Sequence, residues 1–302
     1  MVAGAASRDL AADDPRGWHL GGAATYSALT LARLGLRVRA LVGVDPVAAE
    51  ARELDLLRAA GVEVALARLD RGPVFENVEG RDGRTQRCLS ECDSIAVAAL
   101  PAGWGHEAAW LLGPVADELG MEWASAPSAD AFVALGWQGM LRTLIQGAIV
   151  QRREPARDEL VARADLIGVS LDDVAPGTTP AELIRLIDRQ AVLVVTRSDR
   201  GGLISAPAAR DCDRRRSWHR YRAIPSDGVV DPTGAGDVFL AAMLAARLDP
   251  SSVGRPPGRR SDMRLAAAAA SLAVEAPGLS GVPELGAVLR RMRRRSTRIP
   301  SP

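Results

Sequence analysis

The stretch "DPTGAGDVF", Asp231 to Phe239, is the most informative part of this chain. Two glycines and an alanine lie between two aspartates, directly before a run of helix-forming residues that continues to Leu248. Glycine has no Cβ and adopts positive φ at little cost, so backbone N–H groups can converge in such a turn. The unpaired N–H groups and the dipole of the following helix attract anions, phosphate above all. The pattern therefore predicts an anion-binding turn at a helix N-terminus.

Asp237 is the part of this motif that anion binding alone does not explain, because a carboxylate repels a bound anion. The neighbouring amides are expected to keep Asp237 ionised at neutral pH, so that it accepts a proton from a hydroxyl attacking a phosphoryl group. From the residues alone, two interpretations stay open. Asp237 is either a catalytic base or a carboxylate that only caps the helix and interacts with its dipole.

Composition limits the classes of protein. The 302 residues are 47% hydrophobic and 25% charged, which suits a globular fold with a sizeable core. The net charge of +1 gives no bulk attraction to nucleic acid or to a membrane, so a small molecule is the expected partner. No apolar run reaches the length of a membrane span and no secretion signal is evident, which predicts a cytoplasmic protein. Cys88, Cys92 and Cys212 form no CxxC pair, so we expect reduced thiols without a metal.

The chain contains no lysine, because all 38 basic residues are arginine. This excludes a Schiff-base lysine, the lysine of the P-loop and the strand lysine of protein kinases. Phosphate chemistry in this protein must use backbone amides and arginine.

Apolar runs typical of buried strands alternate with segments typical of helices, which predicts an α/β fold with a mainly parallel sheet. The expected strands are Val2 to Gly4, Val38 to Val42, Ala109 to Gly113, Ala131 to Gly136, Asp165 to Ser170 and Ala191 to Thr196. The expected helices are Ala24 to Leu34, Val47 to Ala60, Ala181 to Asp188, Val238 to Leu248 and Arg264 to Glu275.

Residues 62–92 interrupt this alternation with short β-like pieces that are separated by Gly72-Pro73 and Asp82-Gly83. We expect two adjacent hairpins that project from the sheet, either as an edge meander or as a lid over a ligand. The arginine-rich residues 290–302 are expected to form a flexible, solvated basic tail, and residues 251–260 a loop.

"VVDPTGAGDVFLAAMLA" resembles the C-terminal signature of the ribokinase-like (PfkB) carbohydrate kinase family. "GGAATYSALTLARLG", "ADLIGVSLDDV", "VVTRSDRGGLI" and "AAAAASLAVEAPG" are similar to further segments of that family, in the same order along the chain. The resemblance implies a single three-layer α/β/α kinase domain over residues 1–302 with a small β lid. It also implies transfer of the γ-phosphoryl group of ATP to a sugar or sugar-like polyol, with Mg²⁺ and in some relatives a monovalent cation. A homodimer through the lid is a further expectation.

By this resemblance Asp237 is the catalytic base, and Gly234, Ala235 and Gly236 complete the anion hole with it. Asp9 would hold two acceptor hydroxyls and Gly21 and Gly22 would approach the acceptor through their backbone. Further expected substrate contacts are Tyr26, Phe75, Asn77, Arg87, Gln138 and Arg142. The expected cofactor contacts are Ser170, Thr196, Ser198, Gly201, Asp231 and Thr233, and Asp173 is expected to act on the metal indirectly.

Several residues depart from the family pattern. Tyr26 replaces an asparagine, Ser170 and Asp173 stand where Asn-x-x-Glu is usual, and Ser198 replaces a glycine. Asp173 is one methylene shorter than glutamate, which predicts rearranged metal binding. Two alternatives therefore stay open. One is a nucleoside kinase of the same fold, with Trp137 and Phe75 flanking the base, and the other is a sensor that binds nucleotide or sugar without turnover.

Overall fold

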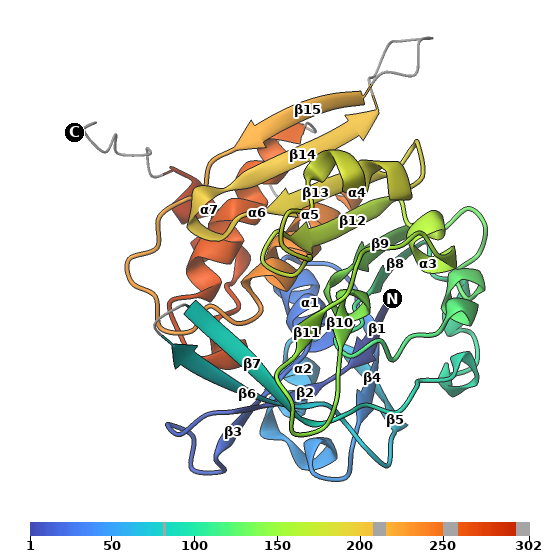
Figure 1. The fold of residues 1–302 in the computed structure, drawn as a ribbon, viewed down its shortest axis with the longest axis vertical. Coiled ribbons are helices and arrows are strands. Elements are labelled where there is room, and N and C mark those ends of the chain that lie inside the picture. Colours follow the sequence, from blue (N-terminus) through green and yellow to red (C-terminus); the bar gives the residue numbers. More distant parts are fainter. Residues whose placement is uncertain (81–82, 208–215, 250–258, 294–302) are drawn as a thin grey trace.

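The computed structural model describes residues 1–80, 83–207, 216–249 and 259–293. Its main sheet has nine strands in the order β15-β14-β13-β12-β9-β8-β1-β4-β5 (Figure 1). Neighbours from β13 to β5 pair in parallel, and β14 and β15 join antiparallel at one edge. These strands are β1 (Val2–Ala5), β4 (Arg39–Val44), β5 (Glu63–Arg68), β8 (Ala109–Leu112), β9 (Phe132–Gly136), β12 (Leu166–Ser170), β13 (Val192–Thr196), β14 (Gly202–Pro207) and β15 (Arg216–Tyr221).

Helices cover both faces of the sheet, and the predicted helices are present with shifted ends. The 47–60 segment is divided, because Ala51 is extended between the 3-10 turn η1 (Ala48–Glu50) and the next helix. The α-helices are α1 (Ala23–Arg33), α2 (Arg52–Ala59), α3 (Glu159–Arg163), α4 (Pro180–Leu186), α5 (Ala235–Leu248), α6 (Arg259–Ala273) and α7 (Leu285–Arg293).

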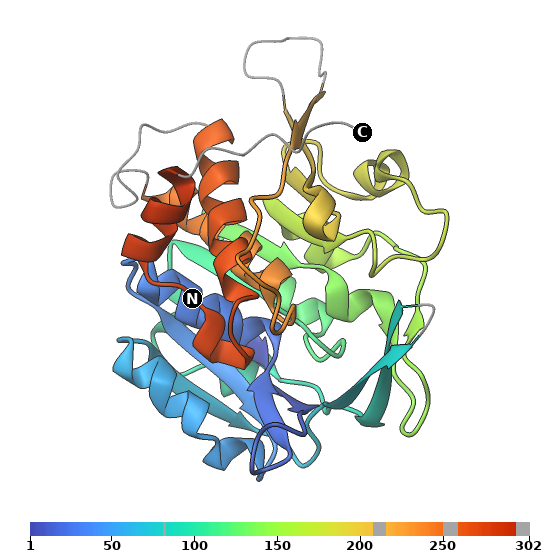
Figure 2. The same ribbon diagram turned by 90° about the vertical axis from the view of Figure 1, so that its left-hand side faces the viewer.

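Two hydrophobic cores lie on opposite faces of the sheet, because successive side chains of a strand point to opposite faces. Along β13, Val192 and Val194 pack into the core formed with α1, α2, α5, α6 and α7. Leu193 and Val195 pack into the other core, which includes α3 and α4. Figure 2 shows α1, α2, α6 and α7 on one side of the sheet and α4 on the other. The predicted three-layer α/β/α arrangement is confirmed.

A second, four-stranded sheet has the order β3-β2-β6-β7 and forms the lid at the lower left of Figure 1. It combines β2 (Ser7–Leu10) and β3 (Trp18–Gly21) with β6 (Val74–Gly80) and β7 (Gly83–Ser90). The expectation of two hairpins within residues 62–92 is wrong in its first part. β5 instead pairs in parallel with β4 over six positions and is the edge strand of the main sheet.

The carboxyl ends of the parallel strands meet at one edge of the sheet, and the chain changes direction there between β1 and β8. From β1 the chain continues to β4 and β5 on one side, whereas β8 and β9 lie on the other side. Such a switch point creates a crevice for ligands at the strand ends. Gly168 in β12 lets α5 approach this region closely, because an added Cβ would lie 3.1 Å from Leu240.

The predicted basic tail begins inside a helix, which is a correction. Arg291 of α7 is 4% exposed and pairs with Glu275 at 2.8 Å, so the burial of its charge is compensated. Residues 294–302, most of the predicted loop 251–260 and Cys212 lie outside the described residues. Cys88 and Cys92 are free thiols, and burial raises the pKa of both. Within the described residues, no helix has the length and apolar character that crossing a membrane requires.

Candidate active site

The turn before α5 has the geometry that its glycines predict. Gly234 caps the helix with φ +76°, in the left-handed region that favours glycine, and Val238 donates to its carbonyl at 2.9 Å. Asp231 fixes the turn, because its two carboxylate oxygens accept the N–H of Thr233 at 2.9 Å and of Gly278 at 3.0 Å. The turn is thus held in place by hydrogen bonds within the protein.

The space in front of Gly236 is open. A Cβ added there would meet no atom within 4 Å, and the residue is exposed. Gly236 has no positive φ, unlike Gly234, so its backbone conformation alone does not require glycine. An anion can therefore approach the first amides of α5 at this position.

Asp237 lies in the first turn of α5 and is partly buried. The pKa of Asp237 is raised to about 7, and burial is the largest cause. The carboxylates of Asp173 and Asp9 also raise this pKa, whereas the guanidinium of Arg142 lowers it. The expectation that the neighbouring amides keep Asp237 ionised at neutral pH is therefore corrected, because desolvation and two like charges raise its pKa to about 7. A carboxylate with this pKa exchanges protons readily near neutral pH.

A chain of contacts connects Asp173 with three other predicted residues. Asp173 accepts a hydrogen bond from Nε2 of Gln138 at 2.8 Å and pairs with Arg142 at 3.5 Å. The guanidinium of Arg142 in turn lies 5.9 Å from the ring centre of Phe75 in the lid. Gln138 and Arg142 follow β9, and Asp173 follows β12, so the chain of contacts connects the main sheet with the lid.

Asp9 lies on β2, where its register places it beside Phe75 of β6. A Cβ added at Gly21 would lie 2.2 Å from Oδ2 of Asp9, so this glycine leaves room for the carboxylate. By strand alternation Asn77 shares the face of Phe75, and Gln86, directly opposite on β7, donates to Oδ1 of Asn77 at 3.1 Å. The lid therefore presents a carboxylate and two amides on one face.

Arg87 lies on the other face of the lid from Phe75 and Asn77. It is opposite Glu76 in the β6–β7 register and pairs with it at 3.7 Å. The structure thus does not bring Arg87 together with the other predicted acceptor residues, because adjacent residues of a strand point to opposite faces.

Four of the six predicted cofactor contacts lie at or just after the carboxyl ends of β12 and β13, where Ser170 and Thr196 are paired in register. The other two, Asp231 and Thr233, lie in the turn before α5. Ser198 has φ +49°, which explains why glycine suits this position, and its hydroxyl donates to Asp172 at 3.0 Å. Gly201 has φ +78°, and an added Cβ would lie 2.2 Å from the carbonyl oxygen of Tyr221. The hydrogen bond from Ser198 ties the Thr196–Gly201 segment to the loop that carries Asp173, and the close approach at Gly201 packs the segment on the end of β15.

Gly22 is the N-cap of α1, and Tyr26 lies in the first turn of this helix. Tyr26 is 2% exposed and packs against Gly234, so it has no surface in an open acceptor pocket. Gly22 has φ +99°, and an added Cβ would lie 2.4 Å from the carbonyl oxygen of Ala5. Its absent side chain permits close packing of α1 on β1.

Sequence reasoning missed two residues of this region. Gln86 could have been found from the alternation of β7, once its register with Asn77 was known. Glu118 carries no local signal. It is fully buried, and its carboxylate accepts the N–H groups of Ala5 at 2.7 Å and Ala116 at 2.8 Å, which fixes the ends of β1 and β8 at the crevice. Burial raises the pKa of Glu118.

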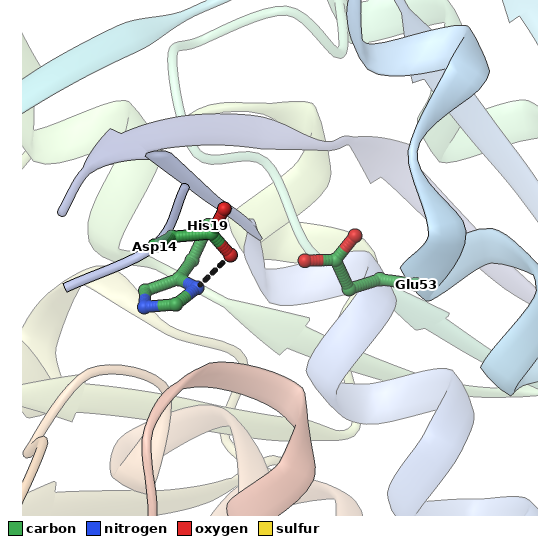
Figure 3. A group of neighbouring side chains, drawn as sticks. All are labelled: Asp14, His19 and Glu53. Carbon is green, nitrogen blue, oxygen red and sulfur yellow. Dashed lines mark ion pairs between the residues drawn. The ribbon is translucent and has the colours of Figure 1, made fainter. Parts of the chain in front are cut away.

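Asp14, His19 and Glu53 form a group whose ligand atoms lie within 4.8 Å of one another (Figure 3). Arginines already neutralise both carboxylates. Arg16 donates to Asp14 at 2.9 Å and to Glu53 at 2.6 Å, and Arg52 donates to Asp14 at 3.0 Å. Two guanidinium groups at these oxygens leave no reason for a divalent cation, so we interpret the group as a structural ion-pair network.

Residues 153–285, which contain the 231–239 motif, match the model of the pfkB family of carbohydrate kinases. This match covers less than half of the chain and makes that part similar to the PfkB carbohydrate kinases. No curated protein matches the sequence.

Three solved structures share the fold over nearly the whole chain. A pyrophosphate-dependent kinase of the ribokinase family, complexed with a pyrophosphate analog and myo-inositol, has a TM-score of 0.68 at 16% identity, covering 94% of this chain and 100% of its own. Arabidopsis thaliana ribokinase, complexed with ribose and ATP, has 0.65 at 17%, covering 97% and 99%. Methanocaldococcus jannaschii nucleoside kinase has 0.63 at 16%, covering 96% and 97%. These identities establish the fold alone.

Proposed function

We propose that this protein is a kinase that transfers a phosphoryl group to a hydroxyl of an uncharged sugar or sugar-like polyol, with Asp237 as the base and the 234–237 amides as the anion hole. The observation that carries the proposal is the pairing of an open, amide-lined turn with a carboxylate whose pKa is about 7. A base with this pKa can take a hydroxyl proton during attack and release it afterwards near neutral pH.

In the proposed reaction the acceptor oxygen forms a bond to the phosphorus while the bond from the phosphorus to the donor's bridging oxygen breaks. Asp237 receives the hydroxyl proton. The amides of Ala235, Gly236 and Asp237 stabilise negative charge on the transferred group, because they are already held in position by the turn. The electron pair of the broken bond leaves with the shortened donor.

Charges in the crevice support an uncharged acceptor. Asp9, Asp173 and Asp237 contribute three carboxylates, and Arg142 is the guanidinium that opposes them in setting the pKa of Asp237. An acceptor that already carries a phosphate would meet this negative potential, whereas the hydroxyls of a polyol can donate to Asp9. The amides of Asn77 and Gln86 offer further partners for hydroxyls on the lid face.

A nucleoside acceptor is less well supported. Trp137 and Phe75, the side chains considered for stacking on a base, are each 1% exposed. Phe75 already lies against the guanidinium of Arg142. A nucleoside would therefore require both rings to be uncovered before its base could stack.

ATP is our proposed donor, and inorganic pyrophosphate is the second candidate. Two observations favour considering pyrophosphate: a structural neighbour is a pyrophosphate-dependent kinase, and Arg197 and Arg200 are exposed beside Ser198 at the end of β13. Arginine binds phosphate oxygens in pairs and would suit a donor without a base.

Asp173 would hold Mg²⁺ through water, since its Oδ1 already accepts from Gln138 and pairs with Arg142. When bound, the ion would neutralise charge on the donor phosphates. The need for a monovalent cation, the lid-mediated homodimer and the cytoplasmic location stay predictions.

The test uses purified protein with Mg²⁺ and either ATP or pyrophosphate, against ribose, fructose, myo-inositol, adenosine and glucose 6-phosphate. We expect turnover with at least one uncharged polyol and its loss in Asp237→Asn. Asp55→Asn, a change at an exposed carboxylate of α2, is the matched control and should retain activity. Activity that survives Asp237→Asn would refute the assigned base, and tight donor binding without any turnover would favour the sensor.

A further inference from the structure

Tyr26 makes the contact on which this inference depends. Its ring lies directly against the backbone of Gly234, because a Cβ added at Gly234 would stand 2.4 Å from Cδ1 and Cε1 of the ring and 2.5 Å from Cζ. Tyr26 is 2% exposed, so the ring is enclosed by protein. The space that a side chain at position 234 would occupy is thus filled by the Tyr26 ring.

The same helix is fixed at its N-terminal end to the acceptor side of the site. Gly22, its N-cap, lies close enough to β1 that an added Cβ would be 2.4 Å from the carbonyl oxygen of Ala5. Gly21, the preceding residue, has no side chain and so leaves room for the carboxylate of Asp9. One rigid helix therefore contacts the acceptor carboxylate region at its start and the anion-hole turn one turn later.

We propose that Tyr26 is a positioning residue for phosphoryl transfer, and that its ring sets the 234–237 turn at a fixed place relative to Asp9. This proposal rests on the proposed function. The ring is stiff and enclosed, so it resists displacement of the turn towards α1. It also explains a departure from the family pattern that the sequence alone could not interpret, since the buried ring of Tyr26, which replaces an expected asparagine, packs on Gly234.

The test compares the steady-state kinetics of Tyr26→Leu and Tyr26→Phe with those of the unaltered protein. In Tyr26→Leu we expect kcat to fall by about 10- to 100-fold, while the KM values for donor and acceptor change by about twofold or less, because misplacing a turn by ~1 Å has costs of this order. Tyr26→Phe keeps the ring and should retain kcat within about threefold. An equal loss in both variants, or a rise in acceptor KM at constant kcat, would overturn the proposal.

Leu31→Ala provides the matched control. Leu31 lies on the same helix and is 5% exposed in the same core, so its truncation should lower the melting temperature and leave kcat unchanged. If Leu31→Ala lowered kcat as much as Tyr26→Leu, general destabilisation would explain the effect and the proposal would fail. Should Tyr26→Leu not fold, Tyr26→Met takes its place with the same expected outcomes.

A readout independent of turnover separates this proposal from the proposed function. Amide hydrogen exchange across residues 231–240 should be faster in Tyr26→Leu and unchanged in Leu31→Ala and Tyr26→Phe. An inactive unaltered protein would refute the proposed function, while the exchange result would still decide whether Tyr26 positions the turn. Unchanged exchange in Tyr26→Leu would refute the positioning role.

Discussion

At the scale of single residues, the pKa of Asp237 results from charges that lie far apart in the sequence. Burial and the carboxylates of Asp173 and Asp9 raise it to about 7, against the opposing effect of Arg142. A group with this pKa is protonated in acid and ionised in base, so a reaction that needs it as a base must accelerate as the pH rises through that range.

The first prediction concerns this pH dependence. kcat/KM should rise with pH along a limb with an apparent pKa near 7. Asp173→Asn removes a like charge, so the limb should move to lower pH, whereas Arg142→Gln removes the opposing charge and should move it to higher pH. Initial rates from pH 5 to 9 measure both shifts. Shifts in the same direction in both variants would contradict the electrostatic explanation.

The second prediction concerns Gly236, in front of which the site is open. In Gly236→Ala the methyl group would occupy the space proposed for the phosphoryl group, so kcat/KM should fall by roughly 100-fold or more. Stability should not fall, because alanine at an unstrained helical position stabilises by about 0.4–1 kcal/mol. Rate assays measure the expected loss of kcat/KM, and urea unfolding measures whether stability is retained. A variant that is both active and more stable would show that no phosphoryl group binds there.

At the scale of elements, the β6–β7 ribbon has one face towards the crevice and one away from it. Gln86 donates to Asn77 on the face of Phe75, while Arg87 pairs with Glu76 on the other face. Two adjacent residues of one strand therefore have different expected roles.

The third prediction uses this pair. Gln86→Ala should raise the acceptor KM about five- to 100-fold with a smaller change in kcat, because a lost hydrogen bond costs roughly 1–3 kcal/mol in a buried site. Arg87→Ala, the neighbouring control, should leave the acceptor KM within about twofold because an exposed ion pair contributes little. Acceptor titrations at saturating donor measure both. A large effect of Arg87→Ala would instead support the sequence-based role of Arg87 in acceptor binding.

The strands differ in how well the sequence predicts them. The parallel strands were recognised because their apolar runs are continuous, as burial on both faces requires. β5 was misassigned because its residues alternate just as lid residues do, and its partner β4 is not evident from local pattern. β2 and β3 were not recognised as half of the lid, since their pairing with β6 joins segments about 65 residues apart.

The candidate site was predictable to a similar extent. The motif and its glycines identified Asp237 and the turn, because those features are local. The expectation that Asp237 is ionised at neutral pH did not anticipate its raised pKa, because the burial of this carboxylate and its nearness to Asp173 and Asp9 arise only in the fold. Tyr26 was expected at the acceptor for the same reason: the helix pattern gives its face but not the turn that packs on it.

At the scale of the whole molecule, the raised pKa of Asp237 has an effect on unfolding. The folded state holds this proton up to about pH 7, whereas the unfolded chain releases it near the ordinary value of 3.8. The folded state therefore binds more protons between these values, and the free energy of unfolding falls with rising pH by about 1.4 kcal/mol per pH unit from this group alone.

The fourth prediction follows. Asp237→Asn has no carboxylate that titrates at this position. The difference between its free energy of unfolding and that of the unaltered protein should therefore increase from about pH 4 to about pH 7 and stay constant at higher pH. Urea unfolding at intervals of pH measures the difference, with Asp55→Asn as the control that should show no such growth. A difference independent of pH would mean that Asp237 titrates normally in the fold.

The partly buried carboxylate of Asp237, on the first turn of α5, thus serves the proposed reaction and lowers the stability of the fold at neutral pH. At neutral pH, Asp237→Asn should therefore withstand heat and denaturant better than the unaltered protein. Laboratories that need a stable sample for crystallisation or ligand screening should begin with this variant.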